Sequence, residues 1–328
     1  MPKHLPLRRA VLRAAAAVLC ASTLLPALAD EWPSRPLRIV VPFAAGGVSD
    51  VAARMVANDL GQALGQGVVV ENKAGAQGVV GSLSARNAPA DGYTLVLMSS
   101  SVACVNPYLR KSMPFNALTD FEPVGMIGSA PLMMLASPKL GVRTVDQFLA
   151  HARAHVGKVN YSTPGVGGSA HLYSEALNTR LKLDMAHIPY QGGAQAVQAL
   201  LAGDVTMTMA DMSFAEAQVV PGKLVALAVA GDRRWPRLPN VPTFAEAGQP
   251  LNLVGWVGLM APAGTPQPIL ERLNTELQKI TAAAHNAERL LRLGVLAGTG
   301  ARAEMTRALR EGCPPWGEAV RRAGIQPE

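Results

Sequence analysis

The chain has 328 residues, of which 49% are apolar, 16% charged and 5% aromatic. That composition is typical of a globular protein with one large core or two ordinary ones, and it excludes intrinsic disorder. The formal net charge is +7, but four of the positive charges lie before residue 14, at Lys3, Arg8, Arg9 and Arg13. The other charges are of both signs and spread along the chain, which argues against a nucleic-acid-binding protein.

The first thirty residues have the pattern of a secretory signal peptide. The basic residues are followed by the apolar run AAAAVLCASTLL, which is too short to span a bilayer, and then by ALA before Asp30. We therefore predict a signal peptide at residues 1–29, cleavage after Ala29 and export to the periplasm. An ordinary N-terminal helix is the alternative. Leu19 stands where a lipoprotein signal needs a small residue before Cys20, so we expect no lipid anchor, and the twin-arginine export route stays open beside the general one.

After the predicted signal, short apolar runs alternate with helical patterns. The runs at residues 37–41, 67–71 and 93–98 are typical of buried strands in a parallel sheet. Between the first two, apolar residues recur at three- and four-residue steps from Val48 to Leu60, which predicts an amphipathic helix on the sheet. This alternation predicts an α/β layer fold.

The same order returns in the second half of the chain. Strands are expected at residues 158–162, 186–190, 205–211 and 224–231, with helices after TPGVGGSAH and within QGGAQAVQALLAGD. The apolar stretches EPVGMIGSAPLMMLAS and VGWVGLMAPAGT are candidates for strands that connect the two halves. We therefore predict two domains with mainly parallel sheets, formed by residues 30–130 plus 255–328 and by residues 131–254.

Three glycine-containing loops precede predicted helices, at Gly46-Gly47, at residues 165–168 and at Gly192-Gly193. A helix N-terminus offers unpaired N–H groups and a partial positive charge, and glycine lets a ligand approach that backbone closely. The loops match neither the P-loop nor the dinucleotide-binding fingerprint, and they contain no lysine. The pattern favours reversible binding of a carboxylate, although turn geometry alone explains any single loop.

The sequence offers no recognisable catalytic machinery. His151 and His155 have a metal-binding spacing, but no Glu stands between them, so we expect them on a solvated helix face. Ser169 and His171 are two positions apart at a predicted helix start and would point apart, and no nucleophile-elbow motif occurs. We predict a protein that is not an enzyme and that uses no metal and no cofactor.

Cys104 and Cys313 are the cysteines that remain after the predicted cleavage. Their spacing matches neither a metal cluster nor a redox motif. A disulfide between them is compatible with an oxidising compartment, but we favour two unrelated buried thiols.

Five segments then identify a family resemblance. They are WPSRPLRIVVPFAAGGVSDVAARMVA, VVVENKAGAQGVVGSLSARNAPADGYTLVL, YSTPGVGGSAHL, IPYQGGAQAVQALLAGDV and VPTFAEAGQP…WVGLMAPAGTP. In this order they resemble the substrate-binding proteins of tripartite tricarboxylate transporters, the Bug family. The resemblance implies a two-domain periplasmic binding protein of the type II-like flytrap class, expected as a monomer. Such a protein captures a small carboxylated organic acid between its domains and delivers it to a two-component membrane permease; a receptor that signals to a membrane sensor protein is the alternative.

The resemblance also implies a set of ligand-binding residues. The first domain would contribute Phe43, Ala44, Gly46, Gly47, Asp50, Ser99 and Ser100, and the second would contribute Thr163, Gly165, His171, Gly192 and Ala194. Asp211 would face the far end of the ligand, with capping of the helix that starts near Ser213 as the alternative role. The sequence does not identify the organic acid.

Two positions depart from the family pattern. Where the family usually has Ser or Thr after the second glycine of the second loop, this chain has Gly168, with Ser169 next. Near the C-terminus, LREGCPPWGEAV places Gly312, Pro314 and Pro315 where the family has a continuous helix. Proline inside a helix costs about 3 kcal/mol, so we predict that this helix is split.

Overall fold

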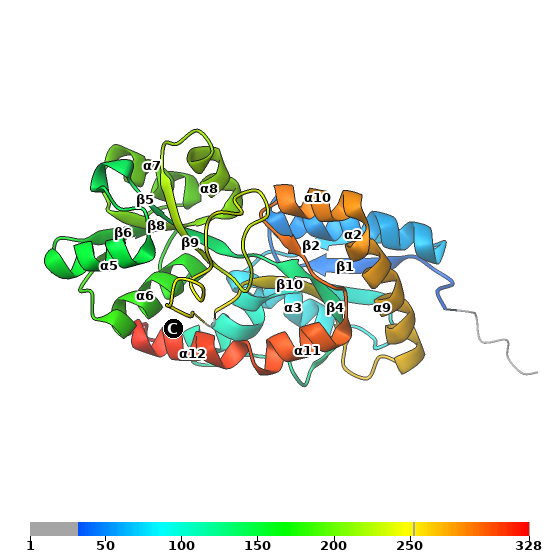
Figure 1. Ribbon diagram of the computed structural model, residues 1–328. Coiled ribbons are helices and arrows are strands. Elements are labelled where there is room, and N and C mark those ends of the chain that lie inside the picture. Colours follow the sequence, from blue (N-terminus) through cyan, green and yellow to red (C-terminus); the bar gives the residue numbers. More distant parts are fainter. Residues whose placement is uncertain (1–31, 252, 328) are drawn as a thin grey trace, which may run out of the picture. The chain divides into compact units, whose positions relative to one another are not determined.

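A computed structural model describes residues 32–251 and 253–327 (Figure 1). The predicted signal peptide and its cleavage site lie outside the described residues. Residues from Arg35 onward form one unit built on two sheets. Within the described ranges, no helix combines the length and apolarity that a bilayer crossing requires.

The first sheet has six strands in the order β11-β4-β10-β3-β1-β2. β1 pairs in parallel with β2 and β3, whereas β10 runs antiparallel to β3 and β4, and β11 antiparallel to β4. The strands are β1 (Leu37–Val41), β2 (Val68–Asn72), β3 (Thr94–Ser99), β4 (Phe121–Ser129), β10 (Trp256–Pro262) and β11 (Leu296–Ala297).

The second sheet has five strands in the order β7-β6-β8-β5-β9. β6 pairs in parallel with β7 and β8, whereas β5 runs antiparallel to β8 and β9. The strands are β5 (Leu132–Ala136), β6 (Asn160–Thr163), β7 (Ala186–Pro189), β8 (Met207–Asp211) and β9 (Val225–Ala230).

The helices cover both faces of the sheets. The helices that come after strands of the first sheet in the chain are α2 (Val48–Leu64), the 3₁₀ turn η1 (Ala76–Gly78), α3 (Val79–Arg86), the π-helical turn η2 (Ser101–Val105), α4 (Asn106–Leu109), α9 (Gln267–Ala282), α10 (Ala284–Arg292), α11 (Arg302–Arg310) and α12 (Cys313–Arg322). Following the second sheet's strands are η3 (Pro138–Leu140), α5 (Val145–Ala154), α6 (Ser169–Leu181), α7 (Gly193–Ala202) and α8 (Met212–Val219).

The strands expected from the apolar runs are confirmed, but the sheets are mixed rather than mainly parallel. The two apolar connecting stretches supply β4, β5 and β10. β10 is inserted between β3 and β4, and β5 between β8 and β9. A strand that enters from the other sheet starts at the edge where its new neighbours end, so it runs against them and makes antiparallel pairs on both sides.

These connecting strands locate the loop edge of each sheet, which is the edge where its parallel strands end and the loops after them begin. At the start of β5, Leu132 pairs with Asp211 and Ala230, the last residues of β8 and β9. At the start of β10, Val257 pairs with Ser99, the last residue of β3. The loops that follow β1, β3, β6, β7 and β8 therefore open at the edges where the chain passes between the sheets.

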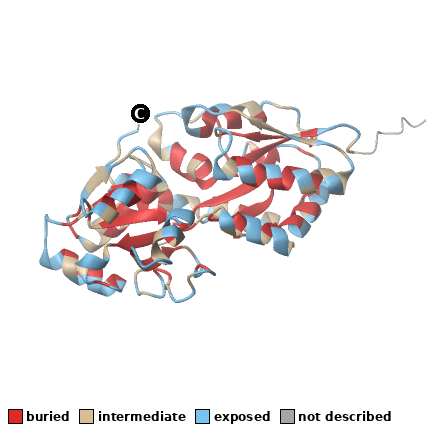
Figure 2. Ribbon diagram, turned by 90° about the horizontal axis from the view of Figure 1, so that it is seen from above, coloured by how far each residue is buried: buried red, intermediate tan, exposed pale blue. Residues whose placement is uncertain are grey.

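The core follows the apolar runs. Every residue of β3, β5 and β10 is buried, as expected for strands covered on both faces (Figure 2). Helix α2 departs from its predicted stripe: Val48 and Val51 are 44% and 37% exposed, while Asp50 is buried. Both valines belong to the first turn, which directly follows the glycine loop after β1.

The C-terminal helix is split as predicted. α11 ends at Arg310, and α12 begins at Cys313 with its prolines in the first turn, where the missing N–H needs no partner. A Cβ at Gly312 would lie 2.6 Å from the backbone oxygen of Ala308. The break therefore requires glycine at its centre.

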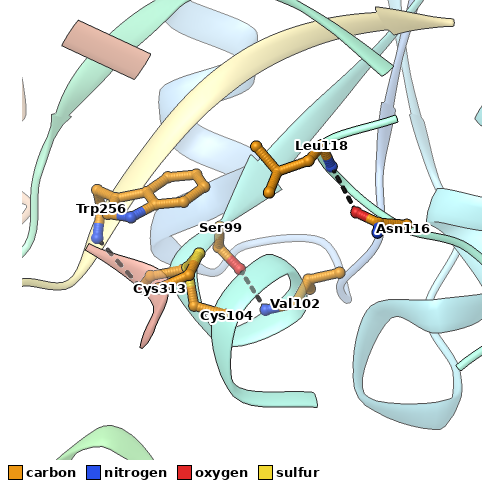
Figure 3. Close-up of a disulfide and its surroundings, with 8 residues drawn as sticks. Ser99, Val102, Cys104, Asn116, Leu118, Trp256 and Cys313 are labelled. Carbon is orange, nitrogen blue, oxygen red and sulfur yellow. Dashed lines mark hydrogen bonds between the residues drawn. A yellow bond between two sulfur atoms is a disulfide. The ribbon is translucent and has the colours of Figure 1, made fainter. Parts of the chain in front are cut away.

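Cys104 and Cys313 form a disulfide, which corrects the prediction of two unrelated thiols (Figure 3). The bridge joins η2, which follows β3 closely, to the first residue of α12 across 209 residues of sequence. Packing of α12 against η2 brings the two Cα atoms to 4.5 Å. Sequence spacing carries no information about such a long-range approach.

Candidate functional site

The first glycine loop is held by Asp50. Its carboxylate accepts hydrogen bonds from the backbone N–H of Gly46 (2.9 Å), from Arg54 Nε (3.1 Å) and from Asn72 Nδ2 (2.9 Å). Arg54 and Gly46 together lower the pKa of Asp50 to about 2. Asp50 and Gly46, both predicted ligand contacts, are thus bonded to each other, and Asp50 acts by shaping the loop.

The exposed part of this loop is the start of α2. Gly47 is the N-cap residue and makes no side-chain capping bond, so the first-turn N–H groups have no capping side chain. A Cβ at Gly47 would meet only the Ala44 oxygen, at 3.8 Å, which leaves the approach to these groups open. Ala44 is exposed, and the half-buried Phe43 has its carbonyl bonded by Asn72.

The hydroxyl groups of the two predicted serines already have hydrogen-bond partners within the protein. Ser99 Oγ lies 2.8 Å from Ser101 Oγ, and Ser100 Oγ accepts a hydrogen bond from the Trp256 backbone N–H at 3.2 Å. Both serines are buried. Their hydroxyls fix the turn after β3 and the start of β10.

A neighbouring loop, which was not predicted, borders the first glycine loop. Ala76 and Gln77 have left-handed backbones with φ of 47° and 55°, a conformation that costs a non-glycine residue about 1–2 kcal/mol. Asn106 Nδ2 bonds the Gln77 oxygen (2.9 Å), and Arg110 bonds the Ala76 oxygen (2.8 Å). A Cβ at Gly78 would lie 3.5 Å from the ring of Phe43, so this loop borders the first one. The paired glycines of KAGAQG are the signal that could have indicated it.

The second glycine loop is held by two histidines. His171 Nδ1 accepts a hydrogen bond from the Gly167 N–H over 3.1 Å. His187 acts through Thr163, whose Oγ1 lies 2.7 Å from His187 Nε2. The same Thr163 hydroxyl donates to the Gly165 oxygen over 2.9 Å. The two imidazoles stack with centroids 4.0 Å apart. Burial lowers the pKa of both, that of His187 to about 4, so both rings are neutral at pH 7. His187 was not predicted, because only the pairing of β6 with β7 brings it to Thr163.

Asp211 lies in a cavity of about 280 Å³ that is also lined by Leu132, Gly165, Gly168 and Ser169. The Asp211 side chain reaches solvent, yet protein surrounds it on most sides, and this desolvation raises its carboxyl pKa. It occupies the N-cap position of α8 without making a capping bond. The alternative capping role therefore lacks its hydrogen bond.

Three helix N-termini meet at this edge. Because β6 pairs in parallel with both β7 and β8, the helices that follow these strands, α6, α7 and α8, all start at the same edge of the sheet. Gly168 and Gly192 are the N-caps of α6 and α7, and neither makes a side-chain capping bond. A Cβ at Gly193 would lie 3.8 Å from Asp211 Oδ2 and 3.0 Å from the ring of Phe214.

The chemistry of this edge suits an anion. Each helix N-terminus contributes unpaired N–H donors and about half a positive charge, and Ala194 is exposed in the first turn of α7. Phe214, which is 38% exposed, adds an apolar surface that was not predicted. Among the described residues, no group of three or more His, Cys, Asp or Glu side chains could hold a metal ion.

Comparison with known sequences gives a consistent result. Residues 52–325 match the family described as the tripartite tricarboxylate transporter family receptor. BugT of Bordetella pertussis is 39% identical over 256 residues, which are 77% of this chain and 78% of that protein. A UPF0065 protein of a Pseudomonas species is 36% identical over 296 residues, 90% of this chain and 88% of that protein.

The chain is also similar to solved structures of bacterial binding proteins. The periplasmic binding protein BugD is 32% identical, with a TM-score of 0.70 over 90% of this chain and 100% of that one. An R. palustris protein solved with adipate is 30% identical, with a TM-score of 0.74 over 91% and 100% of the two chains. MatC from Rhodopseudomonas palustris, with bound malate, is 30% identical, with a TM-score of 0.69 over 88% and 100%. The chain belongs to the tripartite tricarboxylate transporter receptor family, the family of the Bug periplasmic binding proteins.

Proposed function

We propose that this protein is a periplasmic receptor that captures a small carboxylated organic acid and delivers it to a tripartite tricarboxylate-type permease. In this proposal residues 1–29 are the export signal, and the protein works as a monomer and does not chemically change its ligand. The two lobes are residues 30–130 plus 255–328 and residues 131–254. The ligand lies between the loop edges of the two sheets.

One observation carries the proposal: α2, α6 and α7 each start at a glycine N-cap that makes no side-chain capping bond. In the same chain, α5 starts at Thr144, whose hydroxyl accepts the Gln147 N–H. A glycine at the N-cap leaves first-turn donors without a capping side chain, and a carboxylate supplies the acceptor and the negative charge that such an end favours. Similar structures solved with adipate and malate support a ligand of this class.

Residues Gly47, Gly192 and Ala194 would then present backbone to the carboxylate, together with Phe43 and Ala44 on the first loop. Asp50, Ser99, Ser100, Thr163 and His171 would act through the loops that they hold, because their polar groups already have partners. Gly165 and Asp211 would line the far end of the site.

The test begins with native mass spectrometry of protein purified without refolding, which identifies any retained acid. Titration calorimetry then compares that acid, or adipate and malate if none is retained, with its methyl ester. Gly47→Asp places a side chain and a like charge at the first helix start, and Gly67→Asp, at an exposed glycine before β2, is the matched control. Hydrogen bonds to charged groups contribute about 1.5–3 kcal/mol each, so losing two weakens binding by about a hundredfold or more.

The expected result is strong binding of the acid by the parent protein and the control, and loss of binding with the ester or with Gly47→Asp. If the parent protein binds the ester, and Gly47→Asp binds the acid, each within threefold of the affinity of the parent protein for the acid, the loop is structural only. Turnover of the bound acid would show that the protein is an enzyme instead.

A further inference from the structure

Exposed apolar side chains are concentrated around the proposed carboxylate site. Among the described residues, nine large apolar side chains are exposed, and five of these lie in the loops or first helical turns that follow β1, β2, β6 and β8. These five are Val48, Val51, Val80, Val166 and Phe214. Exposed apolar residues scattered singly are ordinary, whereas apolar surface gathered around a few polar groups is typical of a ligand-binding groove.

Phe214 is the largest of these side chains, and it borders the start of α7. A Cβ built at Gly193, the first residue of α7, would lie 3.0 Å from the Phe214 ring and 3.8 Å from Asp211 Oδ2. Phe214 is 38% exposed, whereas Phe148 and Phe244 of the same lobe are 0% and 2% exposed. Because covering an aromatic ring is favourable, a ligand held at this helix start gains affinity if its body is apolar.

The cavity beside Asp211, of about 280 Å³, has a mainly apolar lining. Its apolar lining residues are Leu132, Pro164, Val166, Ala170 and Met209. Among the described lining residues Asp211 is the one charged side chain, and no hydrogen bond or ion pair joins its carboxylate to another described residue. A cavity of about 150 Å³ is sufficient to bind benzene, so this one has room for a body of that size.

The basic residues of the neighbouring loops are already bonded within the protein. Arg54 is paired with Asp50, and Arg110 bonds the Ala76 oxygen and does not line this cavity. A second ligand carboxylate in the cavity would therefore meet the like charge of Asp211 and no cation that offsets it. The end of the ligand that lies in the cavity should carry no negative charge.

We propose that the site selects a monocarboxylate with an apolar body of about the size of a phenyl ring over di- and tricarboxylates, and that Phe214 determines this preference together with Asp211. The proposal rests on the function proposed above and names the class of acid that the same site takes. The ligand carboxylate lies at the glycine N-caps, and its body packs on the Phe214 ring and the apolar lining of the cavity. Asp211 excludes a second carboxylate.

Two matched pairs of acids test the preference by titration calorimetry on the full mature chain. 4-Methylbenzoate is compared with terephthalate, and hexanoate with adipate, so that within each pair a second carboxylate replaces a methyl group. In each pair the monocarboxylate should bind at least about tenfold more tightly, the equivalent of about 1.4 kcal/mol.

Phe214→Ala should weaken 4-methylbenzoate binding about tenfold and leave adipate binding within twofold of the parent value, because the ring supports the apolar body of the ligand. Val220→Ala is the matched control, since Val220 is 72% exposed and follows the last residue of the same helix, and every affinity should stay within twofold. Thermal unfolding of the empty proteins checks that Phe214→Ala is folded.

Asp211→Asn tests the other half of the preference without removing apolar surface. It should reduce the difference in affinity between 4-methylbenzoate and terephthalate about tenfold, because the like charge that opposes the second carboxylate is gone.

Equal or tighter binding of the dicarboxylate in both pairs, with Gly47→Asp still abolishing that binding, would overturn this proposal and leave the receptor function standing. A di- or tricarboxylate retained by the purified protein would have the same meaning, as would an unchanged order of affinities in both Phe214→Ala and Asp211→Asn. Binding of none of the four acids, with no acid retained on purification, would overturn the receptor function and this proposal with it.

Discussion

The carboxylate of Asp50 accepts a hydrogen bond from the backbone N–H of Gly46 over 2.9 Å, and so ties the first turn of α2 to the loop before it. The same carboxylate is bound by Arg54 and by Asn72, which is the last residue of β2. The loop that we expect to bind an anion is therefore built around an anion of the protein itself. Arg54 neutralises that charge, so the N–H groups at the start of α2 remain attractive to a ligand.

Asp50→Ala should destabilise the protein by about 1–3 kcal/mol at pH 7, because it removes hydrogen bonds to a charged group. The folded-state pKa of about 2 lies below the ordinary aspartate value of 3.8, so this contribution is complete above pH 4 and is lost as the pH falls towards 2. Urea unfolding between pH 7 and pH 2.5 measures it, with Asp146→Ala at an exposed aspartate of α5 as the control. Equal stability of Asp50→Ala and the parent at pH 7 would contradict this account of the loop.

His187→Gln should make the stability less dependent on pH below neutrality. The pKa of His187 is lowered from 6.5 to about 4, so the folded protein binds fewer protons than the unfolded chain in this interval. Stability is therefore complete above pH 6.5 and falls as the pH drops towards 4. Gln keeps a polar group for Thr163 but does not titrate. Melting temperatures from pH 7.5 to pH 4 should fall less steeply for the variant, and parallel curves would show that His187 is not the titrating group.

Asp211→Asn should shift ligand preference from amino-bearing acids to dicarboxylates by about tenfold, or about 1.4 kcal/mol. The raised pKa of Asp211 means that its ionised form is unfavourable in the cavity, so the empty variant should melt at the same temperature or higher at pH 7. In the parent, dicarboxylate binding should strengthen as the pH falls and Asp211 is protonated, and the variant should lack this dependence. A thermal-shift panel run at several pH values tests this, and an identical ligand order in both proteins would contradict it.

Replacing both Cys104 and Cys313 by serine should lower the free energy of unfolding by up to about 5 kcal/mol, because the bridge closes a loop of 209 residues in the unfolded chain. Guanidinium unfolding with and without a reducing agent measures the effect. The parent should lose stability on reduction, whereas the double-serine protein should be insensitive to the reductant. A parent protein that is equally stable after complete reduction would show that packing of α12 alone holds this region.

Local features of the fold were predictable from the sequence. The apolar runs located β1, β3 and β9 to within about one residue, and the segment QGGAQAVQALLAGD contains the whole of α7. The split of the C-terminal helix followed from Gly312 and its two prolines. These features depend on residues close together in the chain, whose backbone preferences and burial periodicity are written directly in the sequence.

Contacts between distant segments were decided only by the tertiary structure. The insertion of β10 and β5 between parallel strands made the sheets mixed, and the packing of α12 brought Cys313 to Cys104. The residue-by-residue predictions for the site depended on the same kind of contact. Thr163 is bonded to His187 and Ser100 to Trp256, so hydroxyls that the sequence offered as ligand donors already have partners. The sequence shows which hydrogen-bond donors a loop contains. The order of strands in the sheets determines which of these donors already form hydrogen bonds within the protein.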